Sequence, residues 1–150
     1  MLASKYFLKF AGKHFHSDTK CFDWTTFKSA VSSYPGHDLT AGKFISTTIT
    51  QDDLNTQTMF SNVVSVSKLF WAGIDTSALK GQLEAVVIGP GQKPESHIYQ
   101  CIFASNSVTA NRFYSLVVTI KLQVDKPSRK ISAVFSAMVL ELEESFRAPR

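Results

Sequence analysis

Four histidines are the side chains of this sequence best suited to metal binding or proton transfer. His14 and His16 form an H-x-H pair, while His37 and His97 stand far from them and from each other. Residues two apart share a face on a strand but diverge on a helix, and the surrounding pattern predicts a helix end here. No second H-x-H and no nearby carboxylate pair completes the ligand set that zinc needs. We therefore expect no metal and no cofactor.

The carboxylates are the second group that could do chemistry, as general acids or bases in a pocket that shifts their pKa. Asp52 and Asp53 lie in a polar stretch that predicts a solvated loop, Glu84 in a predicted strand and Asp75 in a predicted turn. Neither a G-x-S-x-G nor a G-x-x-x-x-G-K-[ST] motif occurs. The residues favour a non-enzymatic protein. The alternative is catalysis by Glu84, His97 or Asp75 inside a pocket.

The two cysteines, Cys21 and Cys101, are far apart in the sequence and lie in no metal-binding or nucleophile motif. A disulfide between them stays open, because its geometry cannot be derived from sequence. We expect buried free thiols.

Composition indicates a single globular domain over residues 1–150, with 44% hydrophobic and 19% charged residues. The net charge of +4 is carried by scattered lysines, so we expect no nucleic-acid partner. The helical spacing of Lys5, Lys9 and Lys13 would instead suit anionic lipid headgroups. No apolar run approaches the roughly 20 residues that span a bilayer, so we expect the chain to be soluble as given, with any membrane anchor outside it.

The predicted secondary structure that positions these residues begins with helices. Apolar residues recur at steps of three and four over 2–15, which predicts an amphipathic helix. Asp23 is a good N-cap for a second helix, and Phe22 can pack on Phe27 as a hydrophobic staple. A third, short helix is predicted from Asp38, although the "FISTTIT" that follows is rich in β-branched residues.

Strands are predicted for the rest of the chain. In "FYSLVVTIKLQV", apolar and polar side chains alternate, so one face of that strand is apolar and the other polar. Short turns between consecutive strands imply antiparallel pairing. The predicted class is α+β, with N-terminal helices packed on one face of a curved antiparallel sheet of four to five strands. The strands are expected at 59–73, 78–89, 96–105, 113–124 and 131–143.

Three stretches resemble the periplasmic domains of type IV secretion and conjugation assembly proteins, the VirB-eight-like group with its TraE and DotI/IcmL families. They are the opening "YFLKFA" with "FDWTTFKSAVSSYPG", the pair "FSNVVSVS" and "LKGQLEAVVIG", and the hairpin "SLVVTIKLQVDKPSRKISAVF". The Asn-Pro-x-Gly turn typical of the central VirB-eight-like family is absent. The resemblance implies a nuclear-transport-factor-two-like cone.

In function, the resemblance implies a scaffold on the periplasmic side of the bacterial inner membrane, which binds copies of itself and other channel proteins. Aromatic residues near predicted strand ends would anchor that interface, or else pack in the core. They are Trp71, Tyr99, Phe113 and Tyr114. Two alternatives stay open: an isomerase, cyclase or dehydratase that uses the same cone as an apolar pocket, and a viral or plasmid-borne structural module.

Overall fold

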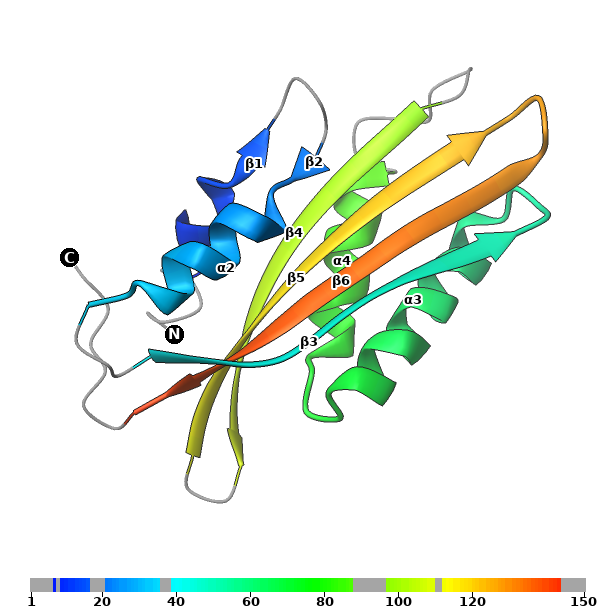
Figure 1. Ribbon diagram of the computed structural model, residues 1–150. Helices are drawn as coiled ribbons and strands as arrows, with labels where there is room; N and C mark the ends of the chain where they lie inside the picture. The colour runs from blue at the N-terminus through cyan, green and yellow to red at the C-terminus, as the bar shows by residue number, and fades with distance from the viewer. Residues whose placement is uncertain are drawn as a thin grey trace.

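A computed structural model describes residues 7, 9–16, 21–35, 39–87, 97–109 and 112–143. Helical residues at 7 and 9–12 come first, then a small hairpin, and then alternating long strands and helices. The elements are β1 Phe15–His16, β2 Cys21–Phe22, α2 Trp24–Ser32, β3 Leu39–Gln51, α3 Thr56–Phe70, α4 Thr76–Val87, β4 His97–Thr109, β5 Arg112–Asp125 and β6 Lys130–Leu142. Figure 1 shows long, twisted strands with α2 on one side and α3 and α4 on the other.

The main sheet has four antiparallel strands in the order β3-β6-β5-β4. β4, β5 and β6 are consecutive neighbours, and a turn at 126–129 connects β5 to β6 as the sequence predicts. β3 lies beside β6 at one edge, and β4 forms the other edge. The helical pair α3 and α4 thus carries the chain across one face of the sheet, from one edge strand to the other (Figure 1).

The α+β class and the antiparallel sheet are confirmed, whereas three of the predicted elements are wrong. The short helix expected from Asp38 is the edge strand β3. The strands expected at 59–73 and 78–89 are the helices α3 and α4. The helices therefore do not all precede the sheet, and they cover both of its faces instead of one.

Helix α2 forms as predicted from its cap and staple. The Asp23 carboxylate accepts a hydrogen bond from the Thr26 backbone N–H at 3.0 Å, and the rings of Phe22 and Phe27 lie 5.6 Å apart. Trp24 donates from its indole N–H to the Thr119 hydroxyl of β5 at 3.1 Å. This bond fixes α2 on the sheet, because a buried indole N–H needs an acceptor.

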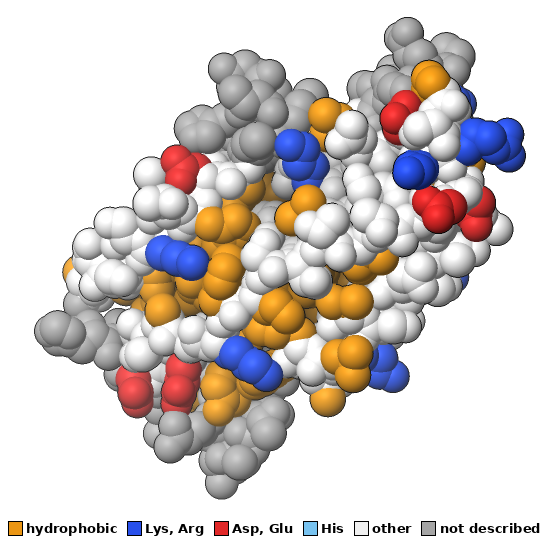
Figure 2. Space-filling model, turned by 45° about the vertical axis from the view of Figure 1, so that its right-hand side comes forward, with side chains coloured by type: hydrophobic (Ala, Val, Ile, Leu, Met, Phe, Trp, Pro, Cys, Tyr) orange, Lys and Arg blue, Asp and Glu red, His pale blue; other side chains and the backbone are white. Residues whose placement is uncertain are grey.

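A hydrophobic cluster, which we call the α2 cluster, holds α2 and the first helical residues on this face. Figure 2 shows hydrophobic side chains reaching the surface on the side of the molecule where α2 lies. The β6 residues of the α2 cluster have even numbers, whereas those that pack under α3 and α4 have odd numbers. Because successive strand residues point to opposite faces, the α2 cluster lies on the face away from α3 and α4. The buried members are Phe7, Ala11, Phe27, Val31, Leu39, Val117, Met138, Leu140 and Leu142.

The opposite face carries α3 and α4, whose caps explain why they are helices. The Asn55 side chain accepts from the Thr58 backbone N–H at 3.1 Å, and Asp75 accepts from the Ala78 backbone N–H at 3.0 Å. Both are N-cap interactions. The valine-rich composition of α3 is typical of a strand, but its buried residues follow helical spacing instead: Met59, Phe60, Val63, Ser67 and Phe70.

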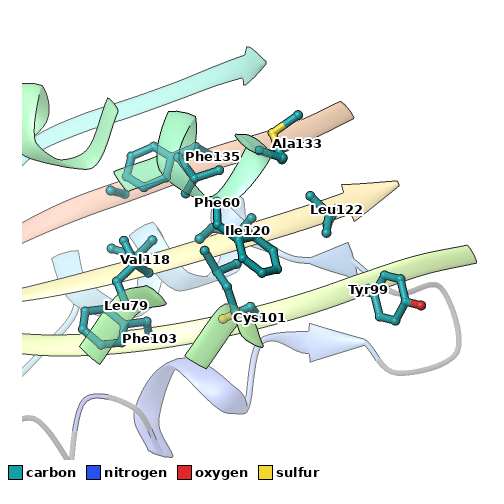
Figure 3. Packing of buried hydrophobic residues seen from close by; sticks show 14 of the residues in the cluster. Phe60, Leu79, Tyr99, Cys101, Phe103, Val118, Ile120, Leu122, Ala133 and Phe135 are labelled. Carbon is teal, nitrogen blue, oxygen red and sulfur yellow. The ribbon is translucent and has the colours of Figure 1, made fainter. Parts of the chain in front are cut away.

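The layer between these helices and the sheet is filled by side chains (Figure 3). Phe60 and Leu79 from the helices and Phe135 from β6 are all fully buried, at 0% exposed. The sheet contributes alternate residues of β4, β5 and β6, so each strand offers one face to this core. Buried side chains of both helices and of the three strands thus form one core on this face.

Truncation of Phe27 tests the packing of the α2 cluster. Phe27→Ala should lower the free energy of unfolding by about 3–5 kcal/mol, because it empties a fully buried aromatic site. Chemical denaturation measures this loss. Leu69→Ala is the control: Leu69 is 86% exposed on α3, so its truncation should change stability by less than about 0.5 kcal/mol. Equal losses from the two variants would contradict the assigned packing.

Candidate interaction surface

The four aromatics expected at an interface lie in two places. Trp71, which caps α3, and Tyr114 of β5 pack edge to face with ring centroids 5.0 Å apart. Phe113 precedes Tyr114 on β5, so its side chain points to the opposite face of the sheet, and it is 38% exposed. Tyr99 lies near the far end of β4, where it is 8% exposed and belongs to the core. In Figure 3 its hydroxyl points away from the cluster. The structure thus brings together two of the four predicted residues, Trp71 and Tyr114.

The polar side chains considered for chemistry have structural roles where the structure describes them. Asp53 accepts from the Gln51 side-chain N–H at 2.6 Å and from the Asn55 backbone N–H at 2.9 Å, which closes the turn into α3. His14 shares a 2.8 Å hydrogen bond with Thr26 and so ties the N-terminal turn to α2. In the described part of the chain, no three His, Cys, Asp or Glu side chains gather as metal ligands.

Of the residues considered for catalysis, the structure describes the side chains of Asp75 and Glu84, which lie at different places, at the N-cap of α4 and within that helix. Asp75 caps α4 at its exposed N-terminus, and Glu84 is half-buried on α4 instead of lying in a strand. His37 and the side chains of His16 and His97 lie outside the described residues, as do Lys5 and the G-P-G turn at 89–91.

Cys101 is a free thiol on β4, as expected, and it is 3% exposed. Burial raises its pKa to about 12, since the apolar surroundings disfavour the thiolate. The thiolate is the nucleophilic form of cysteine, so Cys101 is poorly suited to nucleophilic chemistry. The side chain of Cys21 lies outside the described residues.

The two edge strands are the feature of this molecule that sequence reasoning located least well. β3 pairs only with β6 and β4 only with β5, among the strands that the structure describes. Each therefore presents a row of backbone N–H and C=O groups that no neighbouring strand of the described sheet takes up. The sheet pairings are long: β4 pairs with β5 from His97↔Val124 to Thr109↔Arg112 without a register shift.

These edges lack the charged residues that usually protect an edge strand from a partner strand. β4 contains no Asp, Glu, Lys, Arg or Pro, and neither does the part of β3 from Phe44 to Gln51. The inner strands do carry charges, including Lys121 in β5 and Glu141 in β6.

One end of β3 is protected. A register shift between Ala41 and Phe44 marks a bulge, and bulges bend an edge away from a partner. Gly42 sits in this bulge, where a Cβ would lie 3.1 Å from the Val139 carbonyl oxygen. Lys43 follows, with its ammonium 3.4 Å from the Phe70 carbonyl oxygen. The open part of the edge therefore starts at Phe44.

No protein-family model matches this sequence, and no curated protein matches it significantly. Among solved structures, the chain is similar to a delta-endotoxin, with a TM-score of 0.69 and 7% sequence identity. The match covers 96% of this chain and 77% of that chain. At this identity the likeness shows the fold alone. No described helix is long and apolar enough to cross a membrane.

The buried thiol gives a direct chemical test. In a Cys21→Ser variant, Cys101 should react with a thiol-specific disulfide reagent only after the protein is unfolded. With a pKa of about 12, on the order of one molecule in 10,000 carries the thiolate at pH 8, and the reagent cannot reach the sulfur. Absorbance of the released thiol measures the rate. Equal rates with and without denaturant would place Cys101 at the surface.

Proposed function

We propose that this chain is a non-catalytic protein that works by assembling, through its sheet edges, with copies of itself and with other proteins. The observation that carries this proposal is the pair of long edge strands without Asp, Glu or Pro on their open parts. A strand added to such an edge satisfies its backbone groups, and side-chain complementarity selects the partner.

The filled interior also supports assembly over chemistry in a pocket. Phe60, Leu79 and Phe135 occupy the space between helices and sheet in which an isomerase, cyclase or dehydratase of the cone type would bind its substrate. Asp75 and Glu84, which would be the acids of such an enzyme, lie on α4 and at its cap. The exposed ring of Phe113 on one face of the sheet and the Trp71–Tyr114 pair on the other add aromatic surface on which a partner can dock.

Two biological settings fit an assembling protein. In the first, the chain is a periplasmic component of a type IV secretion or conjugation channel, and its sheet is a variant of the nuclear-transport-factor-two-like cone. The sequence resemblance is the support for this setting. In a multi-copy ring, each edge contact can be weak because many contacts act together.

In the second setting, the chain is a protein toxin. The support is the likeness to a delta-endotoxin over 96% of this chain. Purified protein added to cultured cells distinguishes the two settings. A loss of cell viability at micromolar protein favours the toxin, whereas unaffected cells together with co-purification of channel proteins favour the secretion component.

Sedimentation velocity tests the proposed assembly. The sedimentation coefficient should rise reversibly with protein concentration, because an edge interface buries less than about 1,200 Å² and forms transient complexes. The double variant Thr48→Lys, Ile98→Lys places one charge on each edge strand and should remain monomeric over the same range.

Two changes away from both edge strands, Gln123→Lys on the inner strand β5 and Ser128→Lys in the turn that follows it, are the matched control, since they add the same charge at exposed positions. This variant should associate like the unmodified chain. A chain that sediments as a monomer at every concentration would contradict the proposed function.

A further inference from the structure

We propose that the β3 edge takes a second copy of this chain as its partner, in antiparallel orientation, with Thr47 of one copy opposite Thr47 of the other. The two sheets would then form one continuous sheet around a two-fold axis. This inference rests on the proposed function and specifies which edge acts and in which register.

The sequence of the open edge is self-complementary about Thr47. In this register, Ile45 of each copy lies opposite Ile49 of the other, and Ser46 lies opposite Thr48. Directly opposed residues of an antiparallel pair point to the same face, so apolar meets apolar and hydroxyl meets hydroxyl. A two-fold interface requires this kind of match, because the same strand supplies both sides.

Neighbouring registers between the two β3 strands do not pair both apolar with apolar and hydroxyl with hydroxyl side chains. If the second copy of β3 is shifted by one residue, Ser46 lies opposite Ile49. The second copy is then turned over, so its helices lie on the opposite face of the joined sheet. A shift of two residues opposes Ile45 with Thr47 or with Gln51. Only the pairing about Thr47 joins the two isoleucines and keeps the helices of both copies on one side.

The isoleucines also explain why β3 is a better partner strand than β4. Ile45 and Ile49 are only partly buried against the core, so each leaves apolar surface that the facing isoleucine would cover. The corresponding side chains of β4 are already buried in this chain, at 8% exposed for Tyr99, 3% for Cys101 and 9% for Phe103. A copy docked on β4 would cover little more.

The helices leave room for this arrangement. α3 packs on both β3 and β6, so its axis lies over the gap between these strands. With strands about 4.8 Å apart, α3 and its symmetry mate would lie about 10 Å from each other, near the usual helix-packing distance. The two copies would therefore meet as two layers, helix beside helix and strand beside strand.

Charges at the ends of the pairing agree with the register. The open edge is bounded by Lys43 at one end and by Asp52 at the other, and both are exposed. In the two-fold arrangement, Phe44 faces Thr50 of the second copy, so Lys43 lies just beyond the paired segment, on the side of Asp52 of that copy. Opposite charges thus meet at both ends of the interface, which favours this partner orientation.

Disulfide trapping tests the register. In the Cys21→Ser background, Thr47→Cys should form a disulfide-linked dimer at least tenfold faster than Thr50→Cys in a glutathione redox buffer. Opposed Cα atoms in an antiparallel pair lie about 4.5–5.5 Å apart, within disulfide range, whereas two copies of residue 50 would lie about 20 Å apart. Equal rates, or faster linkage at position 50, would overturn the proposed register.

Substitutions of opposite charge at Thr47 provide a second test, which does not depend on disulfide geometry. Thr47→Lys and Thr47→Glu should each weaken self-association at least tenfold, because like charges face each other across the axis. An equimolar mixture should restore dimers, which sedimentation velocity detects. If the unmodified chain associates and each single variant associates as strongly as the unmodified chain, the β3 register is wrong while the proposed assembly stands. If the unmodified chain never associates, both proposals fail.

Discussion

The pairing of β5 with β6 is the constraint on which the rest of this structure depends. The two strands are hydrogen-bonded from Phe113↔Leu142 to Asp125↔Lys130. Along their middle, residues 115–120 and 135–140 are buried without interruption, so both faces of this part of the sheet need cover. α3 and α4 supply it on one face, and α2 with the first helical residues supplies it on the other.

Covering both faces of the inner strands leaves the edges as the exposed part of the sheet. β3 and β4 lie outside the β5–β6 pair, and their open backbone groups carry the proposed function. The inner strands hold charged residues, whereas β4 and the open part of β3 from Phe44 to Gln51 do not, which is the reverse of the arrangement that keeps a sheet monomeric. In the proposed function, recognition therefore takes place at these edges.

Part of the fold could be predicted from sequence because its signals are local. The alternation of 113–124, the turn after Asp125 and the cap at Asp23 all act within a few residues, and the structure has each of them. The β-branched residues of α3 predict a strand, but the structure follows the helical spacing of Met59 and Val63 instead.

The candidate surface was harder to predict because an edge is a property of the whole sheet. Whether β3 is an edge depends on its pairing with β6, about 90 positions later in the chain, as in the Ser46–Ser136 contact. No local pattern specifies such a pairing. The predicted aromatics were near strand ends, but Tyr99 lies in the core because α4 packs on β4.

Hydrogen exchange of the β3 amides, measured at low and high protein concentration, tests most directly the claim that this chain assembles through its sheet edge. Amides of residues 44–51 that face away from β6 should exchange fast in dilute protein and become protected at high concentration, while the α3 amides stay unchanged. Exchange of the β3 amides that does not depend on concentration, in protein that nevertheless associates, would contradict the account and place the interface elsewhere.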